Sequence, residues 1–253
     1  MSGIIKRTAA GLLTAAVMLG LSGCALLGGD QGLNQNPVRT YDYSKMKLVQ
    51  LEEPYEGQPT ATFETDAGSI TAVLYPEYAP NTVNNFIARV NDGFYDGQDI
   101  YGILEGEIFM SGAADAKKDS GITSDGELIA NEVSVDLWTL KGAICAYNGH
   151  AGYGDSRFFV INERPLTEED ITELRGLTGD DGSKLLPDEL IDAFIEKGCI
   201  AGFAGRYTVF AQTIEGFDVI EKICASEVSG ELYAPTTPIY INKVTLGEYH
   251  AQK

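Results

Sequence analysis

The chain has little positive charge and few residues of the kinds that bind metals. Its 253 residues include 18 Lys and Arg against 37 Asp and Glu, a formal net charge of −19 at pH 7. Contacts with nucleic-acid phosphates need clustered basic side chains, so this composition excludes nucleic-acid binding. Only two His and four Cys are present, and no two Cys have the C-x-x-C spacing. We therefore expect neither a metal site nor any other cofactor.

The chain also lacks a long hydrophobic run. Lys6 and Arg7 precede an apolar stretch, residues 8–21, that is too short to span a bilayer comfortably and runs on into the letters LSGC. Small residues before a cysteine, in this order, resemble the signals of bacterial lipoproteins. The resemblance implies that residues 1–23 are a signal peptide and that Cys24 carries a diacylglycerol, with fatty acids such as palmitate. The mature chain is then expected to be extracytoplasmic and anchored to a membrane through Cys24.

Residues 24–59 predict a linker between the lipidated cysteine and the folded domain. They are rich in Gly, Asn, Gln and Pro and show no hydrophobic period. As a flexible coil, such a segment reaches roughly 30 Å. A part of it, around residues 47–51, is the candidate for packing on the domain.

Three cysteines remain after lipidation of Cys24, and an odd number cannot all pair within one chain. They are Cys145, Cys199 and Cys224. We predict that they are buried as small apolar side chains. One disulfide involving Cys199 is the alternative.

Residues 60–250 predict a single, mainly β domain. The segments TFET and SITAVLYP flank DAG, which is a hairpin signal, and several more short strands follow. An amphipathic helix is predicted from Pro80 to Gly93, with a stripe formed by Val83, Phe86, Ile87 and Val90. A second helix is predicted within residues 216–226. Many short strands with two flanking helices favour a closed antiparallel β-barrel, because closure removes exposed sheet edges.

Residues 163–200 interrupt the strands and predict a helical insertion. Thr167 and Asp170 have the spacing of a capping box, and Pro187 opens a second helix. That helix carries an apolar stripe formed by Leu190, Ile191, Phe194 and Ile195. We predict that the stripe packs on the barrel; a lid or a partner-binding surface is the alternative.

Three stretches, in this order, resemble the cyclophilin-type peptidyl-prolyl cis-trans isomerases. They are TFETDAGSITAVLYPEYAPNTVNNFIARVNDGFYDG, KGAICAYNGHAGYGDSRFFVIN and AGRYTVFAQTIEGFDVIEKI. The resemblance covers about residues 60 to 250. It implies a cyclophilin-like barrel and an isomerase that acts on proline-containing segments of exported proteins and assists their folding.

The reaction makes simple physical demands. Rotation about an X-Pro bond breaks amide resonance, a barrier of about 18–20 kcal/mol. An apolar pocket that holds the proline ring helps, as does a donor aimed at the prolyl nitrogen, whose lone pair localises as the bond twists. Cyclophilins use an arginine as that donor, and no cofactor is needed.

The resemblance places Gly102 at the position of the catalytic arginine. In an ungapped register over residues 100–112, Met110 stands where the family has a glutamine and Glu107 where it has a pocket phenylalanine. A shift of one residue in the second half brings Ile108, Phe109 and Ser111 to the groove instead. Neither register restores the arginine. A glycine within a strand is also typical of a β-bulge, so a bulge and a lost catalytic residue both remain open at Gly102.

At other positions of the substrate groove, this sequence keeps some residues of the cyclophilin family and replaces others. Gly202 replaces a tryptophan, Tyr207 a histidine and Phe203 a pocket leucine, whereas Phe159 is retained as the second aromatic of RFF. The residues predicted to bind substrate are Phe159, Phe203, Tyr207, Asn148, Tyr147, Ala146, Met110, Ser111, Phe109 and Tyr101.

Two functions follow from this pattern. The first is a membrane-anchored isomerase whose activity is weak because Gly102 replaces the arginine. The second is a non-catalytic module of the same fold that binds extended or proline-containing segments.

Overall fold

The computed structural model describes residues 41–115, 117–148, 152–179 and 182–251. The predicted signal peptide 1–23, Cys24 and the first part of the predicted linker lie outside these residues. None of the helices described here is long and apolar enough to cross a membrane.

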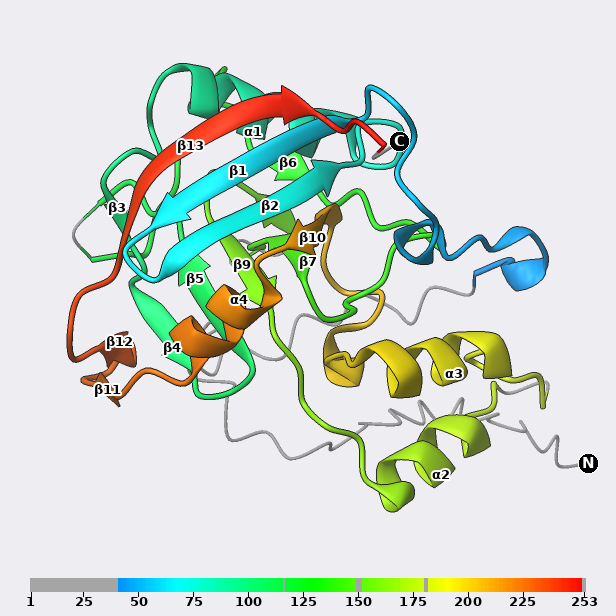
Figure 1. The fold of residues 1–253 in the computed structure, drawn as a ribbon. Coiled ribbons are helices and arrows are strands. Elements are labelled where there is room, and N and C mark those ends of the chain that lie inside the picture. Colours follow the sequence, from blue (N-terminus) through cyan, green and yellow to red (C-terminus); the bar gives the residue numbers. More distant parts are fainter. Residues whose placement is uncertain (1–40, 116, 149–151, 180–181, 252–253) are drawn as a thin grey trace, which may run out of the picture.

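Short antiparallel strands are the main regular element of the described chain (Figure 1). The strands are β1 (Pro59–Thr65), β2 (Gly68–Leu74), β3 (Gln98–Asp99), β4 (Gly102–Leu104), β5 (Ile108–Ser111), β6 (Ile129–Ala130), β7 (Ala143–Ala146), β8 (Tyr153–Gly154), β9 (Phe158–Ile161), β10 (Val209–Glu215), β11 (Val228–Ser229), β12 (Ala234–Pro235) and β13 (Tyr240–Glu248). Nine of them form one sheet in the order β3-β13-β1-β2-β10-β7-β9-β5-β4. The predicted hairpin over the DAG turn is the β1–β2 pair.

The sheet curls round to its own start. Its two outermost strands, β3 and β4, are consecutive in the chain and are separated only by Ile100 and Tyr101. The N–H of Ile100 donates to the carbonyl of Ile239, beside β13, at 2.9 Å, and the N–H of Tyr101 donates to the carbonyl of Met110, in β5, at 3.1 Å. Because neighbouring residues bond at opposite edges of the sheet, the chain connects the two edges of a curled, barrel-like antiparallel sheet, as the fold prediction expected; the edge strands β3 and β4 do not pair with each other in this sheet.

Helices α1 (Pro80–Asn91) and α4 (Phe217–Cys224) are the two predicted flanking helices. The stripe of α1, including Val83 and Phe86, belongs to the same buried cluster as Val219 and Ile220 of α4 and the inward side chains of the sheet. Each fully buried aliphatic or aromatic side chain contributes about 1.5–3 kcal/mol. The two helices are therefore part of the barrel's core.

The insertion forms helices α2 (Glu168–Gly176) and α3 (Asp188–Lys197), beside the barrel in Figure 1. The predicted capping box is present, with the side chains of Thr167 and Asp170 each bonded to the other's backbone N–H. In α3, Leu190, Ile191 and Phe194 are buried, as predicted. Ile195 is 45% exposed, so its assignment to the buried stripe was wrong.

The stripe of α3 packs on a cluster that includes the end of the predicted linker. Phe194 meets the ring of Trp138 at 6.2 Å, and Trp138 stacks on Tyr43 at 6.3 Å. Tyr41, Met46 and Leu48 pack against the same cluster. Residues 47–51, the part of the linker expected to pack on the domain, do so through Leu48 and Val49. The packing of residues 41–46 was not expected, because irregular chain and the 3₁₀ turns of this segment, η1 (Tyr43–Lys45) and η2 (Val49–Leu51), give no hydrophobic period.

The three cysteines are free and buried, so the predicted burial is confirmed and the alternative disulfide at Cys199 was wrong. Burial raises the pKa of Cys199 and of Cys224 to about 12 and raises that of Cys145 further. None of the three is a thiolate at neutral pH.

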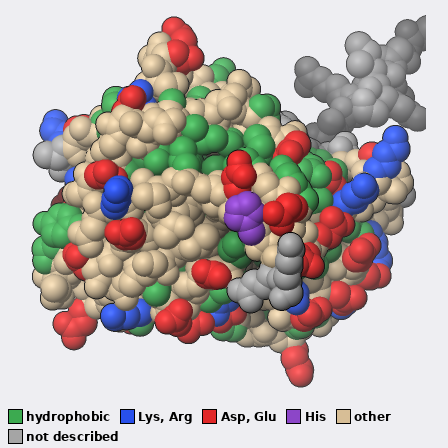
Figure 2. Space-filling view, turned by 45° about the horizontal axis from the view of Figure 1, so that its top comes forward, with side chains coloured by type: hydrophobic (Ala, Val, Ile, Leu, Met, Phe, Trp, Pro, Cys, Tyr) green, Lys and Arg blue, Asp and Glu red, His purple; other side chains and the backbone are tan. Residues whose placement is uncertain are grey.

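The surface carries the excess of acid. Figure 2 shows Asp and Glu side chains scattered over the viewed face, with Lys and Arg side chains scarcer. On this face the charge is spread out, and a strongly acidic surface of this kind favours solubility.

Candidate active site

Strands β5 and β9 divide their side chains between the two sides of the barrel wall. Phe109 and Phe158 point into the interior cluster, whereas Met110 and Phe159 belong to a second cluster on the outside. This follows from the two-residue period of a strand. We call the outward surface of β5, β7 and β9 the outer face.

Four positions form one row across the outer face. Gly102 pairs with Met110, Met110 pairs with Phe159, and Phe159 pairs with Cys145. Paired residues on neighbouring strands point to the same side of a sheet. A side chain at position 102 would therefore project onto the outer face beside Met110 and Phe159.

Gly102 lies at a local irregularity of the strand. Ile100 and Ile103 face the interior, and Tyr101 and Leu104 face outward, so one extra residue, Gly102, interrupts the alternation. Tyr101 donates its N–H to the carbonyl of Met110, the residue with which Gly102 itself pairs. Two residues opposite one is the arrangement of a β-bulge. Both interpretations of this glycine are thus compatible: it sits in a bulge, and its missing side chain would have faced the site.

Three aromatic rings close over the middle of the outer face. The ring of Phe159 lies 4.9 Å from that of Tyr207 and 5.8 Å from that of Phe203, both edge-on, and the latter two rings are 5.2 Å apart. Phe159 has no exposed surface, whereas Phe203 and Tyr207 are half-buried. The two outer rings therefore cover Phe159, and a ligand reaches its ring only if they turn aside.

The covering segment also contacts the insertion. Phe203 ends the 3₁₀ turn η3 (Ala201–Phe203). Ala201 and Ala204 pack on the cluster of Trp138 and α3, while Phe203 and Tyr207 pack on the outer face. The insertion thus positions the aromatic cover.

A buried ion pair adjoins these rings. Arg157 lies two residues before Phe159 and hence on the same face. Its guanidinium Nη2 donates to Asp155 Oδ2 at 2.6 Å, and its Nε donates to Asp155 Oδ1 at 3.0 Å. Both side chains are at most 3% exposed. Burial alone lowers the pKa of Arg157, but the hydrogen bonds and charge of Asp155 raise it overall, so the guanidinium stays charged.

The ion pair is stacked on an aromatic ring. The central carbon of the Arg157 guanidinium lies 4.6 Å from the centroid of the Tyr147 ring, within the range of a cation–π contact. Tyr147 also donates its N–H to the carbonyl of Arg157 at 3.0 Å. Sequence reasoning missed Arg157 and Asp155; the signal was the charged pair in DSRFF, at two-residue spacing from Phe159.

The structure gathers some of the predicted substrate-binding residues and separates others. Those of the outer cluster are Tyr101, Met110, Tyr147, Phe159, Phe203 and Tyr207. Asn148 is half-buried and donates its side-chain N–H to the carbonyl of Arg206, next to Tyr207.

Phe109, Ser111 and Ala146 are not part of the outer face. Phe109 and Ala146 belong to the interior cluster, and Ser111 is fully buried and donates its hydroxyl to the carbonyl of Asp99. The pairing therefore corresponds to the ungapped register, with Met110 outward. A slip by one residue moves every side chain of a strand to its other side.

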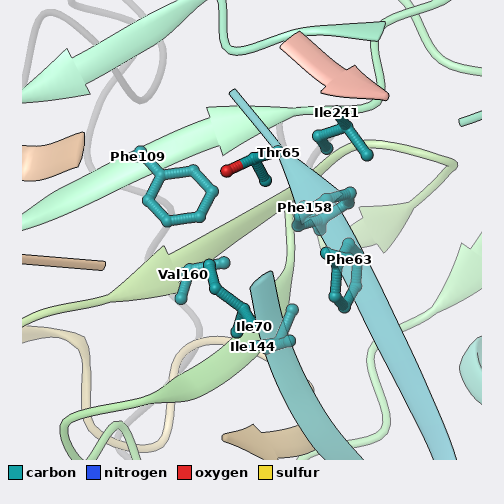
Figure 3. Close-up of a pocket in the computed structure, with 8 residues that line it drawn as sticks. All are labelled: Phe63, Thr65, Ile70, Phe109, Ile144, Phe158, Val160 and Ile241. Atoms are coloured by element: carbon teal, nitrogen blue, oxygen red, sulfur yellow. The ribbon is translucent and has the colours of Figure 1, made fainter. Parts of the chain in front are cut away.

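The cavities lie elsewhere. A cavity of about 10 Å³ inside the barrel is lined mainly by apolar side chains, including Phe63, Phe109 and Phe158 (Figure 3). That volume is about the least that holds one water, so it is a packing gap and not a substrate site. A surface depression beside Lys222 and Pro238 contains none of the predicted site residues. Within the described residues, no group of three His, Cys, Asp or Glu is placed to hold a metal.

Comparison with known families identifies the class of protein. A family model described as "Cyclophilin type peptidyl-prolyl cis-trans isomerase/CLD" matches residues 60–246. The match spans well over half of the chain, which therefore belongs to the cyclophilin-type peptidyl-prolyl cis-trans isomerase family.

Individual relatives agree with this family. A protein of Staphylococcus aureus (strain USA300), whose name assigns it provisionally to the peptidyl-prolyl cis-trans isomerases, is 26% identical over 197 residues, which are 78% of this chain and 96% of that protein. A similarly named protein of Staphylococcus epidermidis (strain ATCC 12228 / FDA PCI 1200) is 27% identical over 189 residues, 75% of this chain and 90% of its own length.

Solved structures share the fold. The crystal structure of a cyclophilin-type peptidyl-prolyl cis-trans isomerase of Cryptosporidium parvum superposes with a TM-score of 0.57 at 16% identity, covering 79% of this chain and all of that one. A second crystal structure of that protein, in the presence of the dipeptide Ala-Pro, gives a TM-score of 0.55 at 16% identity and covers 76% of this chain and 99% of the other. At this identity the similarity shows the fold alone.

Proposed function

We propose that the protein is a weak peptidyl-prolyl isomerase whose site is the outer face around Phe159. The observation that carries the proposal is the row Gly102–Met110–Phe159, in which the aromatic ring is present and the position two strands away, beside Met110, has no side chain. Loss of one preorganised donor costs about 2.7–4 kcal/mol, a factor of roughly 100 to 1000 in rate. Without this donor, the removal of water from the X-Pro bond by the apolar rings lowers the barrier to rotation, because the planar amide is more polar than the twisted one and loses more hydration.

The substrates proposed are proline-containing segments of exported proteins. Support comes from family membership and from the related Cryptosporidium parvum protein, which was crystallised in the presence of Ala-Pro. Phe203 and Tyr207 cover Phe159, so binding of a proline ring requires that both outer rings rotate away.

A second function, peptide binding without turnover, is favoured by the same cover and by the missing side chain at Gly102. In that case the outer face holds an extended segment in either proline isomer. The two functions differ in one quantity, the exchange rate of the bound X-Pro bond.

The test is NMR exchange on a peptide with one Ala-Pro bond, using the full chain in detergent micelles, with Gly102→Arg and Phe203→Ala as variants. We expect exchange above the uncatalysed rate, an increase of at least tenfold in Gly102→Arg, and a smaller increase in Phe203→Ala, which uncovers the ring of Phe159. Phe159→Ala is a poor variant because Phe159 is fully buried and its removal destabilises the fold. Peptide shifts without faster exchange would establish the binding function instead.

We further propose that Cys24 is lipidated and anchors the domain outside the cytoplasm. The support is the order of Lys6 and Arg7, the short apolar run and the small residues before Cys24. Two or more acyl chains give stable membrane attachment. Labelling cells with radioactive palmitate should mark the protein, and Cys24→Ser should abolish both the label and recovery in the membrane fraction; label retained in Cys24→Ser would refute the anchor.

A further inference from the structure

One buried hydroxyl on the outer face has no partner. The Tyr101 side chain is 5% exposed, and its hydroxyl oxygen makes no hydrogen bond. Among the described residues, Tyr101 is the only aromatic side chain with such an atom. Buried polar groups are almost always hydrogen-bonded, and each exception needs an explanation.

The surroundings of this hydroxyl are those of the site. Tyr101 immediately precedes Gly102 and packs in the same cluster as Met110, Tyr147 and Phe159. Burial raises the pKa of the Tyr101 phenol, and among the charges that act on it the guanidinium of Arg157 comes first and lowers it. Asp155 and Asp99 also act on the phenol and raise its pKa. The hydroxyl therefore remains protonated and can donate its proton to an acceptor.

A second tyrosine provides the contrast. Tyr95 is 2% exposed, and its hydroxyl donates to the carbonyl of Ser156 at 3.0 Å. Tyr95 packs in the interior cluster, where no ligand enters. The chain thus satisfies the hydroxyl of its interior tyrosine and leaves that of the site tyrosine unmatched.

Resting on the proposed function, we infer that the Tyr101 hydroxyl is a binding group for the substrate, donating a hydrogen bond to a backbone carbonyl of the proline-containing peptide. The Asp155–Arg157 pair, stacked on Tyr147 of the same cluster, is a further polar group of this site. The site then has an apolar part around Phe159 and a polar part at Tyr101. Sequence comparison at Gly102 alone does not reveal this second part.

The test compares Tyr101→Phe with the matched control Tyr95→Phe in the full chain. A backbone carbonyl is present in both the planar and the twisted peptide, so Tyr101→Phe should raise KM about five- to tenfold and leave kcat nearly unchanged. The midpoint of thermal unfolding should stay the same or rise, because the variant removes an unmatched polar group. Tyr95→Phe should do the reverse, lowering the midpoint by a few degrees without altering KM.

An unchanged KM in Tyr101→Phe, or a fall in its unfolding midpoint as large as that of Tyr95→Phe, would overturn the inference. If the wild-type chain accelerates no exchange, the proposed function fails, and chemical-shift titration with the same Ala-Pro peptide then measures the binding group separately. A five- to tenfold weaker affinity in Tyr101→Phe would still support it, and an equal affinity would refute it.

Discussion

The two sides of strands β5 and β9 differ although they share one backbone. The inward side, with Phe109 and Phe158, packs mainly against apolar side chains of the sheet, of α1 and of α4 and against the ring of Tyr95. The outward side, with Met110 and Phe159, meets rings from a distant segment and a buried ion pair. The interior is filled by side chains of the sheet and its flanking helices. The outer face is covered by side chains from loops, which the insertion contacts. Stability should therefore depend most on the first side and ligand binding on the second.

The largest expected effect is on the interior. Phe158→Ala removes a fully buried ring that meets Phe63 and Tyr95, and should lower the free energy of unfolding by about 3–5 kcal/mol. Urea unfolding followed by circular dichroism measures this. A loss below 1 kcal/mol would mean that the interior tolerates a cavity and that the contrast between the two sides is wrong.

The next effect concerns the ion pair of the outer face. Asp155→Asn leaves the guanidinium of Arg157 buried without its counter-charge, so we expect a loss of about 3 kcal/mol. The double variant Asp155→Asn with Arg157→Gln should recover part of it, because no charge is then left unpaired. A double variant less stable than Asp155→Asn would show that the pair is not the cause.

A smaller effect is expected at the aromatic cover. Phe203 is half-buried, so Phe203→Ala should cost about 2 kcal/mol of stability. It should also expose the ring of Phe159, which Phe203 and Tyr207 meet edge-on. Binding of an apolar dye or of an Ala-Pro peptide, measured beside unfolding, separates the two consequences. Equal losses of stability in Phe203→Ala and Phe158→Ala would show that Phe203 is as important for folding as an interior residue, which contradicts the prediction.

The smallest effect is electrostatic and lies at the edge of the outer face. Burial raises the pKa of Glu107, and the charge of Arg164 lowers it in part. Because the folded state favours the protonated acid, the contribution of Glu107 to stability is present below the ordinary pKa, near 4.5, and is lost as the pH rises past the raised value. Glu107→Gln should therefore raise the unfolding midpoint at pH 7 by roughly 1–2 °C and leave it unchanged at pH 4. An equal change at both pH values would contradict this.

Much of the barrel could be predicted because its signals are local. The hairpin over DAG, the stripe of α1 and the capping box of α2 each lie within a few residues, and each is present. The packing of residues 41–46 could not be predicted, because their partners, Trp138 and α3, are far away in the sequence. The exposure of Ile195 likewise depends on where α3 meets its neighbours.

The sequence predicted which residues belong to the candidate site better than it predicted where their side chains point. A resemblance that rests on motif order brought Phe159, Phe203 and Tyr207 together, and the structure places their rings in contact. It also brought in Phe109 and Ala146, which the strand alternation turns inward. Motif spacing does not report the side of a strand when a bulge, here at Gly102, precedes it.

The sequence by itself determined the short strands, the four helices and the absence of a side chain at position 102, because these depend on residue type and local period. Only the tertiary structure decided that Tyr101 and Gly102 share the outer face, that two rings cover Phe159, that Arg157 stacks on Tyr147, and that the Tyr101 hydroxyl has no partner. Such features arise from the register between strands and from segments that meet across the fold. Each of them depends on residues from several segments that are distant in the sequence.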